Sequence, residues 1–294
     1  MTAATTSKVT VTTLAALKAR GEKAVFVTAY DFATATFADR AGVDMVLIGD
    51  SAAMTMMGLP NPLGIGMDEM CVFVRSVCRA VSRPFVVGDL PFLSYQASDE
   101  RAVLNAGRFV ALGCDAVKCE GGARVARRVR AMVNAGMSVM GHIGLTPQSL
   151  GPLGGYRVQG KSRFAAEQLA EDAIALEEAG AFAILLEAMP AETAAYVRER
   201  VDVDLLVYGI GAGPYVDGQL VISHDILGAF VGDVAPRFVR PYGRIGLAIE
   251  QAFRSYADDV RAGRFPGPEQ CYRMDPADEA EIREARERLV RARS

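Results

Sequence analysis

The chain has 294 residues, no tryptophan and a formal net charge of -3, and 51% of its residues are hydrophobic. This composition is that of a globular protein, and the length fits one large domain or two medium ones. A slightly acidic chain without a Lys/Arg block argues against a nucleic-acid surface, and no apolar run approaches the roughly 18 residues of a membrane helix. Five cysteines without a CxxC pair or a secretion signal predict reduced thiols in the cytoplasm.

Short apolar runs alternate with helical patterns along most of the chain. Residues 1–13 lack the apolar core of a targeting signal, and a short helix is predicted over Val11–Arg20. Longer helices are predicted from their spacing over 32–41, 68–80, 97–112, 123–134 and 164–179. The apolar runs are typical of strands buried on both faces, and they are Ala24–Tyr30, Met45–Ile48, Phe85–Gly88, Ala116–Cys119, Val139–Gly141, Ala183–Leu186, Leu205–Val207 and Leu220–Ile222.

This alternation predicts βαβ units, a parallel sheet and the α/β class. Eight units in about 225 residues fit a (β/α)8 TIM barrel, in which the chemistry takes place at the C-terminal strand ends. Seven of the eight runs are followed by Asp, Glu or His, and the other by a glycine loop. The competing fold is an open doubly wound sheet. It needs a glycine fingerprint after the first strand, where residues 28–31 instead read Thr-Ala-Tyr-Asp.

The predicted organisation is a single barrel domain with a C-terminal helical extension. Residues 1–22 form the N-terminal segment, residues 23–265 the catalytic barrel and residues 266–294 a charged helical tail. Helical spacing over Tyr242–Ala262 fits packing on the barrel. The stretch Asp278–Arg293 is dense in Glu and Arg, so we expect it to be exposed or to make subunit contacts.

Three carboxylates, Asp50, Asp89 and Glu120, follow three separate strands. In a barrel these strand ends converge on one mouth, where like charges repel unless a cation lies between them. Ligand sets made only of oxygen favour a hard ion, Mg²⁺ before Mn²⁺. The alternative is that each acid caps a helix or pairs with an arginine. The coincidence of all three acids favours the magnesium site.

Other polar side chains near strand ends are candidates for substrate contact. Lys118 precedes Glu120 by two residues, so both side chains point from the same strand face into one site, where the lysine would offset negative charge on a ligand. A Schiff-base role for Lys118 is the weaker alternative. His142 ends the fifth run in a position suited to a substrate hydrogen bond, whereas His224 fits a structural role equally well.

Glu187 directly follows the apolar run Ala183–Leu186. Such surroundings can raise the pKa of a carboxyl group, which suits a general base. The alternative for Glu187 is a helix N-cap beside Pro190.

Two glycine-rich segments are predicted as loops. Residues 209–213 form a tight barrel loop because Pro214 interrupts a nucleotide-binding pattern, and residues 51–66 form a connection long enough to be functional.

Several sequence blocks occur in the order expected of one enzyme family. They read Thr28-Ala29-Tyr30-Asp31, Gly49-Asp50-Ser51, Asp89-Leu90-Pro91-Phe92, Lys118-Cys119-Glu120-Gly121-Gly122, Gly141-His142-Ile143-Gly144-Leu145-Thr146-Pro147-Gln148-Ser149, Gly155-Tyr156-Arg157-Val158-Gln159-Gly160, and Gly209-Ile210-Gly211-Ala212-Gly213 with Asp217-Gly218-Gln219. Over roughly residues 8–268 the chain resembles the ketopantoate hydroxymethyltransferase (3-methyl-2-oxobutanoate hydroxymethyltransferase) family, within the phosphoenolpyruvate mutase/isocitrate lyase-like barrel superfamily.

The resemblance implies transfer of a hydroxymethyl group from 5,10-methylenetetrahydrofolate to 3-methyl-2-oxobutanoate, giving 2-dehydropantoate for pantothenate synthesis. It also implies a cytoplasmic homo-oligomer, commonly a decamer in this family. The residues implied are Asp50, Asp89 and Glu120 for Mg²⁺, Asp50, Ser51, Asp89, Lys118 and His142 for the 2-oxo acid, and Glu187 as the base. Chemically, a 2-oxo acid chelates Mg²⁺ through its carboxylate and ketone oxygens, and the ion stabilises the enolate as a Lewis acid.

The rim of the predicted site departs from the family pattern. Family members usually carry Gly-His or Gly-Tyr and then Asp-x-Thr-Leu-Pro-Val-Thr after the first acid, whereas residues 58–66 read Gly-Leu-Pro-Asn-Pro-Leu-Gly-Ile-Gly. A paralogue that acts on a different 2-oxo acid is therefore one alternative. A carbon–carbon lyase of the superfamily is another, although the Lys-Lys-Cys-Gly-His loop typical of those lyases does not occur in the sequence. A non-catalytic barrel would need a broken site.

Overall fold

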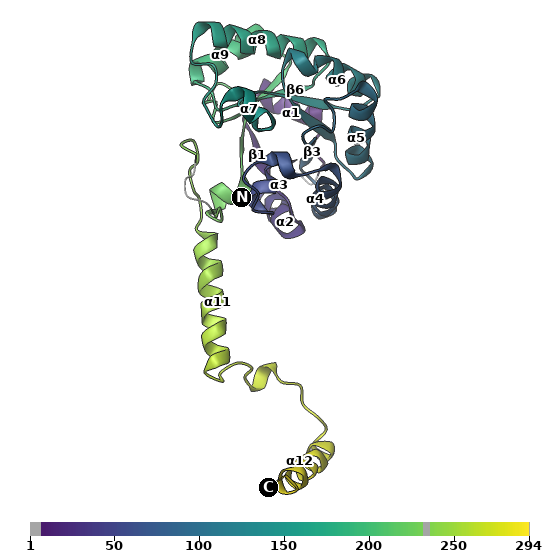
Figure 1. Ribbon diagram of the computed structural model, residues 1–294, viewed down its shortest axis with the longest axis vertical. Helices are drawn as coiled ribbons and strands as arrows, with labels where there is room; N and C mark the ends of the chain where they lie inside the picture. Colours follow the sequence, from purple (N-terminus) through teal and green to yellow (C-terminus); the bar gives the residue numbers. More distant parts are fainter. Residues whose placement is uncertain (1–6, 232–235, 294) are drawn as a thin grey trace. The chain divides into compact units, whose positions relative to one another are not determined.

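The computed structural model describes residues 7–231 and 236–293 (Figure 1). The chain divides into two compact units, the first ending at Gly243 and the second beginning at Arg244. The first unit holds the barrel strands, and the second holds the C-terminal helices. The domain limits predicted at residues 22 and 265 stay predictions.

Eight parallel strands form a closed barrel in sequence order. They are β1 Ala24–Thr28, β2 Met45–Ile48, β3 Phe85–Asp89, β4 Ala116–Glu120, β5 Val139–Gly144, β6 Ala183–Glu187, β7 Leu206–Ile210 and β8 Gly218–Val221. The ring closes between β1 and β8, and Phe26 pairs with Met45 on one side and with Leu220 on the other. The predicted α/β class and (β/α)8 TIM barrel are confirmed.

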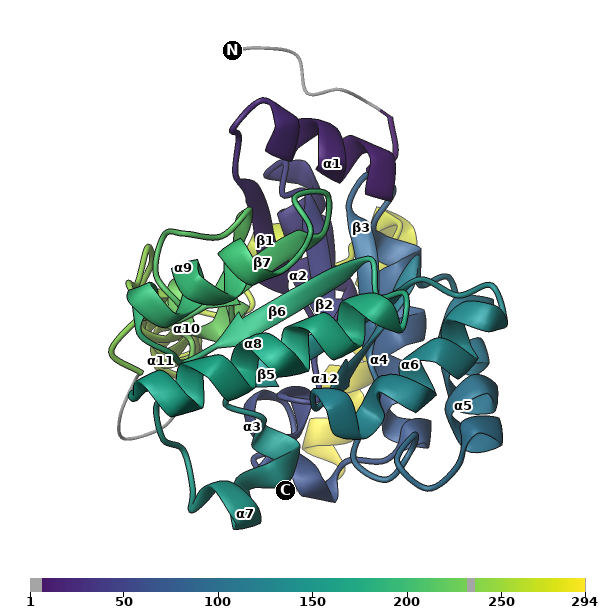
Figure 2. The same cartoon turned by 90° about the horizontal axis from the view of Figure 1, so that it is seen from above.

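Helices pack around the outside of the barrel and follow its strands in turn (Figure 2). The helices of the first unit are α1 Val11–Ala19, α2 Phe32–Arg40, α3 Ala52–Thr55, α4 Met67–Ala80, α5 Asp99–Ala111, α6 Ala123–Asn134, α7 Leu150–Leu153, α8 Arg163–Glu178, α9 Ala191–Arg200 and α10 Ser223–Leu227, with 3₁₀ turns η1 Pro62–Gly64 and η2 Pro147–Ser149. Side-chain caps fix where α5 and α8 begin, since Ser98 and Ser162 accept hydrogen bonds from backbone N–H groups in the first turns of these helices.

Alternate side chains of each strand face opposite sides of the barrel wall. Phe26 is one of the buried side chains that fill the interior, whereas Cys119 belongs to the apolar layer between strands and helices. Because both faces are buried, the strands read as continuous apolar runs. Along β4 the inward positions are Ala116, Lys118 and Glu120, so the same periodicity that fills the interior delivers two charged groups to the barrel mouth.

Helix α1 covers the N-terminal ends of the strands. Its residue Leu14 is 1% exposed and packs with Val9 into the apolar cluster of the barrel interior. Two hydrogen bonds place the helix there, because the Val9 N–H donates to the Arg83 carbonyl and Lys18 Nζ donates to the carbonyl of Leu205, just ahead of β7. The predicted short N-terminal helix therefore closes the barrel at the N-terminal ends of its strands.

We expect Leu14→Ala to lower the free energy of unfolding by about 2–5 kcal/mol, because it removes buried methyl groups and leaves a cavity at the barrel floor. Denaturant unfolding followed by circular dichroism measures this loss. The matched control is Leu104→Ala on α5, where the leucine is 62% exposed. Equal, small losses for the two variants would show that α1 does not contribute to the core.

Two predicted strand ends and one predicted loop differ from the structure. His142 does not end its strand, because β5 continues to Gly144, which pairs with Glu187 of β6. The loop predicted from residue 209 begins later, since β7 continues to Ile210, which pairs with Glu187 of β6. Residues 51–66 are not a plain loop, because α3 and η1 lie within them. Strand pairing uses backbone groups, so it can extend beyond an apolar run.

The second unit consists of α11 Ile245–Arg261, the 3₁₀ turn η3 Pro268–Gln270 and α12 Pro276–Arg291. None of the described residues in these helices is buried. Along α11, Ile245, Ile249, Phe253 and Tyr256 recur at helical spacing and are all more than 40% exposed. None of the helices in the two described ranges is long and apolar enough to cross a membrane.

Candidate active site

The C-terminal strand ends surround a cavity of about 840 Å³. Its walls include apolar side chains from several strands, among them Leu47, Leu185, Ile210 and Leu220. All the predicted site residues line it, namely Asp50, Ser51, Asp89, Lys118, Glu120, His142 and Glu187. Residues that are distant in sequence meet here because the barrel gathers all its strand ends at one mouth.

Lys118 is the cation of the acidic cluster. Its Nζ lies 2.8 Å from Asp89 Oδ1 and 3.6 Å from Glu120 Oε1, and the three side chains are at most 3% exposed. Burial lowers the pKa of Lys118, but the charges of Asp89, Glu120 and Asp50 outweigh burial and raise that pKa above its ordinary value. Lys118 is therefore a protonated ammonium, which argues against the Schiff-base alternative because that chemistry needs a neutral amine.

Asp50 and Asp89 lie beside each other at the ends of β2 and β3. The Asp50 backbone N–H donates to Asp89 Oδ2 at 3.1 Å, and Asp50 Oδ2 accepts a hydrogen bond from Gln148 Nε2 at 2.9 Å. Burial raises the pKa of Asp50 well above its ordinary value, and the charges of Asp89 and Glu120 add to this effect. A further cation at Asp50 would stabilise its ionised form.

His142 connects the acidic cluster with Glu187. Its Nδ1 lies 3.2 Å from Lys118 Nζ, and its Nε2 lies 3.1 Å from Glu187 Oε2 without the alignment of a hydrogen bond. The same Nδ1 lies 3.4 Å from Glu120 Oε1. Burial and Lys118 lower the pKa of His142, but its contacts with the Glu120 and Glu187 carboxylates outweigh them and raise that pKa above its ordinary value. The Glu187 side chain is 17% exposed against 2% for His142, so Glu187 is the carboxylate that can meet a substrate.

Ser51 is oriented by Tyr30, which the sequence analysis did not single out as a site residue. The Tyr30 hydroxyl lies 2.7 Å from Ser51 Oγ, and burial raises the pKa of Tyr30 to about 12, so the phenol stays protonated. The Tyr30 ring packs against His224, with 5.6 Å between ring centroids. His224 therefore supports this corner, in line with its structural alternative. The block of residues 28–31 at the first strand end already contained the signal for Tyr30.

The cluster has the donor atoms that a hard cation needs. Three carboxylates face one ammonium, so negative charge is in excess, and Asp89 Oδ1 makes no hydrogen bond although it is ion-paired with Lys118. Within the described residues, no three Asp, Glu, His or Cys side chains are gathered closely enough to hold a metal by themselves. Mg²⁺ commonly takes one or two carboxylates and completes its shell with water and substrate. The residues thus fit an ion that binds together with a substrate.

The segment in which the sequence departs from the family pattern reaches the cavity. Of residues 58–66, Pro62 of η1 lines it. Met54 and Thr55 of the preceding helix α3 and Tyr156 from the segment after α7 line it as well. The Tyr156 hydroxyl lies 3.5 Å from Met54 Sδ, which brings the two segments into contact at the cavity wall. Substitutions in residues 51–66 can therefore change the shape of the space offered to a substrate.

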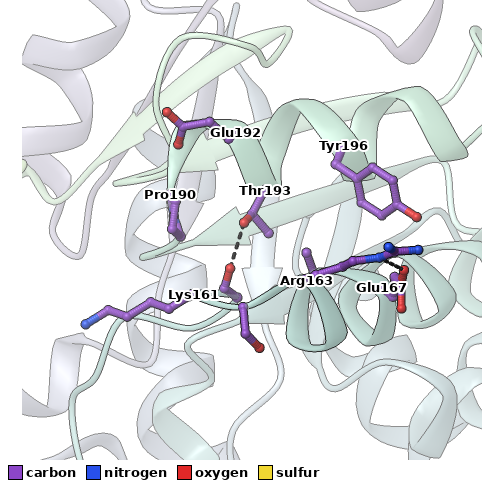
Figure 3. A pocket seen from close by; sticks show the side chains of 10 residues that line it. Lys161, Arg163, Glu167, Pro190, Glu192, Thr193 and Tyr196 are labelled. Atoms are coloured by element: carbon purple, nitrogen blue, oxygen red, sulfur yellow. Dashed lines mark hydrogen bonds and ion pairs between the residues drawn. The ribbon is translucent and has the colours of Figure 1, made fainter.

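A second cavity, of about 560 Å³, lies between the N-terminal parts of α8 and α9 (Figure 3). Thr193 Oγ1 donates to the Gly160 carbonyl at 2.7 Å, and Arg163 pairs with Glu167 at 2.8 Å. None of the predicted site residues lines this cavity. The candidate active site is therefore the cavity at the strand ends.

Known proteins with similar sequences match this chain over most of its length. The sequence profile of a family described as Ketopantoate hydroxymethyltransferase matches residues 8–268. The chain belongs to the ketopantoate hydroxymethyltransferase family. One relative, the 3-methyl-2-oxobutanoate hydroxymethyltransferase of Moorella thermoacetica, is 48% identical over 268 residues, covering 91% of this chain and 98% of the relative. The protein of the same name from Ignicoccus hospitalis is 47% identical over 260 residues, covering 88% of this chain and 97% of that relative.

Membership in the ketopantoate hydroxymethyltransferase family confirms the predicted resemblance and the enzyme class, a one-carbon transferase. Solved structures extend the likeness at the level of the fold. A phosphonopyruvate hydrolase crystallised with oxalate and Mg²⁺ has a TM-score of 0.59 at 17% identity, covering 96% of this chain and 98% of that one. A 2,3-dimethylmalate lyase of the PEP mutase/isocitrate lyase superfamily has a TM-score of 0.57 at 18% identity, with the same coverages.

Proposed function

We propose that this chain transfers a hydroxymethyl group to 3-methyl-2-oxobutanoate in a Mg²⁺-dependent reaction, with 5,10-methylenetetrahydrofolate as donor and 2-dehydropantoate as product. Relatives that share nearly half of its residues carry the name of this activity. The observation that carries the proposal is a buried acid–lysine cluster facing the same cavity as a more exposed carboxylate, Glu187. This arrangement separates the binding of an anionic oxo acid from the removal of its proton.

The cluster supplies the charges that a 2-oxo acid requires. Lys118 offsets the substrate carboxylate, and Ser51, held by Tyr30, offers a hydroxyl to a substrate oxygen. Asp50, Asp89 and Glu120 would hold Mg²⁺ together with the substrate and water. When bound, Mg²⁺ polarises the ketone and so makes the hydrogen on C3 more acidic.

Glu187 is the proposed general base. It takes the proton from C3 of the oxo acid, and its Oε2 lies 3.1 Å from His142 Nε2 on the side of the cluster. The substrate carbon then forms a bond to the methylene carbon of the donor. The two carbon–nitrogen bonds of that methylene break, and tetrahydrofolate leaves with its two nitrogens protonated by the proton taken from C3 and one proton of water. The rest of that water becomes the hydroxyl group of the product.

The second candidate function is hydroxymethylation of a different 2-oxo acid in a specialised biosynthetic pathway. The apolar walls, which include Leu47, Leu185 and Leu220, suit the two methyl groups of 3-methyl-2-oxobutanoate. These three side chains carry no polar group that would select an acceptor by the length of its carbon chain. Pro62, from the altered residues 58–66, lines the same space. This observation supports a paralogue with another acceptor as the second candidate.

Two further properties belong to this proposal. The first is a homo-oligomer, of decamer size, supported by the exposed apolar side chains of α11, namely Ile245, Ile249, Phe253 and Tyr256. The second is a cytoplasmic location, supported by the five cysteines, all of which are free thiols in the structure.

Exchange of the C3 hydrogen in D₂O tests the first half of the reaction without the folate. We expect the protein to exchange this hydrogen in 3-methyl-2-oxobutanoate only when Mg²⁺ is present, and EDTA to stop the exchange. Proton NMR follows the loss of the C3 signal, and adding 5,10-methylenetetrahydrofolate should then give 2-dehydropantoate. Faster exchange with another 2-oxo acid would favour the paralogue, and the absence of exchange with any acid would contradict both candidates.

A further inference from the structure

Two buried polar side chains, Gln148 of η2 and Tyr95 of the segment after β3, lie behind the acidic cluster. They are 4% and 0% exposed, and they stand behind the cavity wall rather than in it. A buried amide and a buried phenol must find hydrogen-bond partners inside the protein, or they cost free energy. Their partners are the acids of the proposed active site.

The Gln148 amide is held in one orientation. Its Nε2 donates to Asp50 Oδ2 and to the Leu90 carbonyl, both at 2.9 Å, and its Oε1 accepts from the Tyr95 hydroxyl at 3.0 Å. The two acceptors cannot donate, so only this orientation satisfies both ends of the amide. In the described part of the chain, Gln148 is the only hydrogen-bond donor to the Asp50 carboxylate.

Glu120 is held by the same two residues. The Gln148 backbone N–H donates to Glu120 Oε2 at 2.9 Å. The Tyr95 hydroxyl accepts a hydrogen bond from the Glu120 N–H at 2.9 Å and lies 3.0 Å from the Glu120 carbonyl oxygen. It therefore contacts both backbone polar groups of the last residue of β4. Gln148 and Tyr95 thus fix two of the three acids that come from different strands.

We propose that Gln148, oriented by Tyr95, is the positioning residue that sets the spacing between Asp50 and Glu120 and so prepares the cluster for Mg²⁺ and the oxo acid. This inference rests on the proposed function. Gln148 acts through the acids, since it does not line the cavity. The loops after β3 and β5 therefore serve as a frame that spans the strand ends and limits how far the acids can move apart when they repel one another.

The central test replaces the amide by a side chain of the same length, in Gln148→Met. We expect the Mg²⁺ concentration for half-maximal C3 exchange to rise about 10- to 100-fold, as is typical when a partner that orients a metal ligand is lost. Tyr95→Phe, which keeps the ring, should also raise the Mg²⁺ concentration for half-maximal exchange. The matched control is Gln168→Met on α8, where the side chain is exposed and the value should stay that of the wild type.

Isothermal titration of MgCl₂ into protein that holds 3-methyl-2-oxobutanoate gives a second readout that does not depend on turnover, and Mg²⁺ affinity should fall by the same factor. Unchanged Mg²⁺ affinity in Gln148→Met, with a lower melting temperature alone, would overturn the positioning role. If Gln148→Met does not fold, Tyr95→Phe decides by the same two measurements. A wild-type protein without exchange would instead contradict the proposed function, so the two failures are distinguishable.

Discussion

Glu187→Gln should reduce deuterium exchange at C3 of the oxo acid by about 10²- to 10⁴-fold, because the amide cannot accept the proton that the carboxylate takes. Binding of Mg²⁺ and the oxo acid should persist, since the proposed binding site for both is the cluster around Lys118, whose acids do not include Glu187. Proton NMR in D₂O measures the exchange rate, and isothermal titration measures binding in the same variant.

The matched control for the base is Glu192→Gln on α9, an exposed glutamate that does not line the strand-end cavity. Its exchange rate should equal that of the wild type. If Glu187→Gln keeps full exchange, Glu187 is not the base, and another group at the cavity must take the proton. If exchange and binding are lost together, Glu187 acts in binding the substrate.

The second large effect is expected for Lys118→Met. This change leaves Asp50, Asp89 and Glu120 buried without their cation, and removing one partner of a buried ion pair typically costs about 3–5 kcal/mol. We expect the free energy of unfolding in EDTA to fall by this amount. Because another cation can take over part of the role of the ammonium, MgCl₂ should stabilise the variant more than it stabilises the wild type.

Thermal unfolding with and without MgCl₂ measures this effect. Lys161→Met, at an exposed lysine, is the control and should show the stability and the Mg²⁺ response of the wild type. A Lys118→Met variant as stable as the wild type would mean that the acids become protonated without cost. A variant with the expected loss but no added response to Mg²⁺ would contradict the metal site at this cluster.

Strand-end reasoning predicted most of the candidate site because of a simple property of the fold. Asp89, Glu120 and Glu187 are the last residues of β3, β4 and β6, and a closed parallel barrel brings all such ends to one mouth. The two-residue period along β4 likewise predicted that the side chains of Lys118 and Glu120 point from the same face of the strand. In the structure Lys118 Nζ lies 3.6 Å from Glu120 Oε1. These are local patterns, so they can be read from the chain.

Other parts of the site could not be read in this way. Gln148 occurs in a motif that the sequence analysis noted, but its contacts with Asp50 and Glu120 bridge loops that follow different strands. Tyr95 was not noted, because a tyrosine between strand and helix carries no periodic signal. His142 was placed at a strand end, although it lies within β5, whose last pairs depend on the backbone of β6.

The sequence alone determined the α/β class, the number of strands and the set of polar residues at the barrel mouth, because burial on two faces and the strand period leave their mark on adjacent residues. The tertiary structure alone decided which carboxylate is paired and which is open. Lys118 lies 2.8 Å from Asp89, whereas Glu187 keeps contact with the cavity. Pairing of charges depends on distances between strands and loops, which local sequence patterns do not specify.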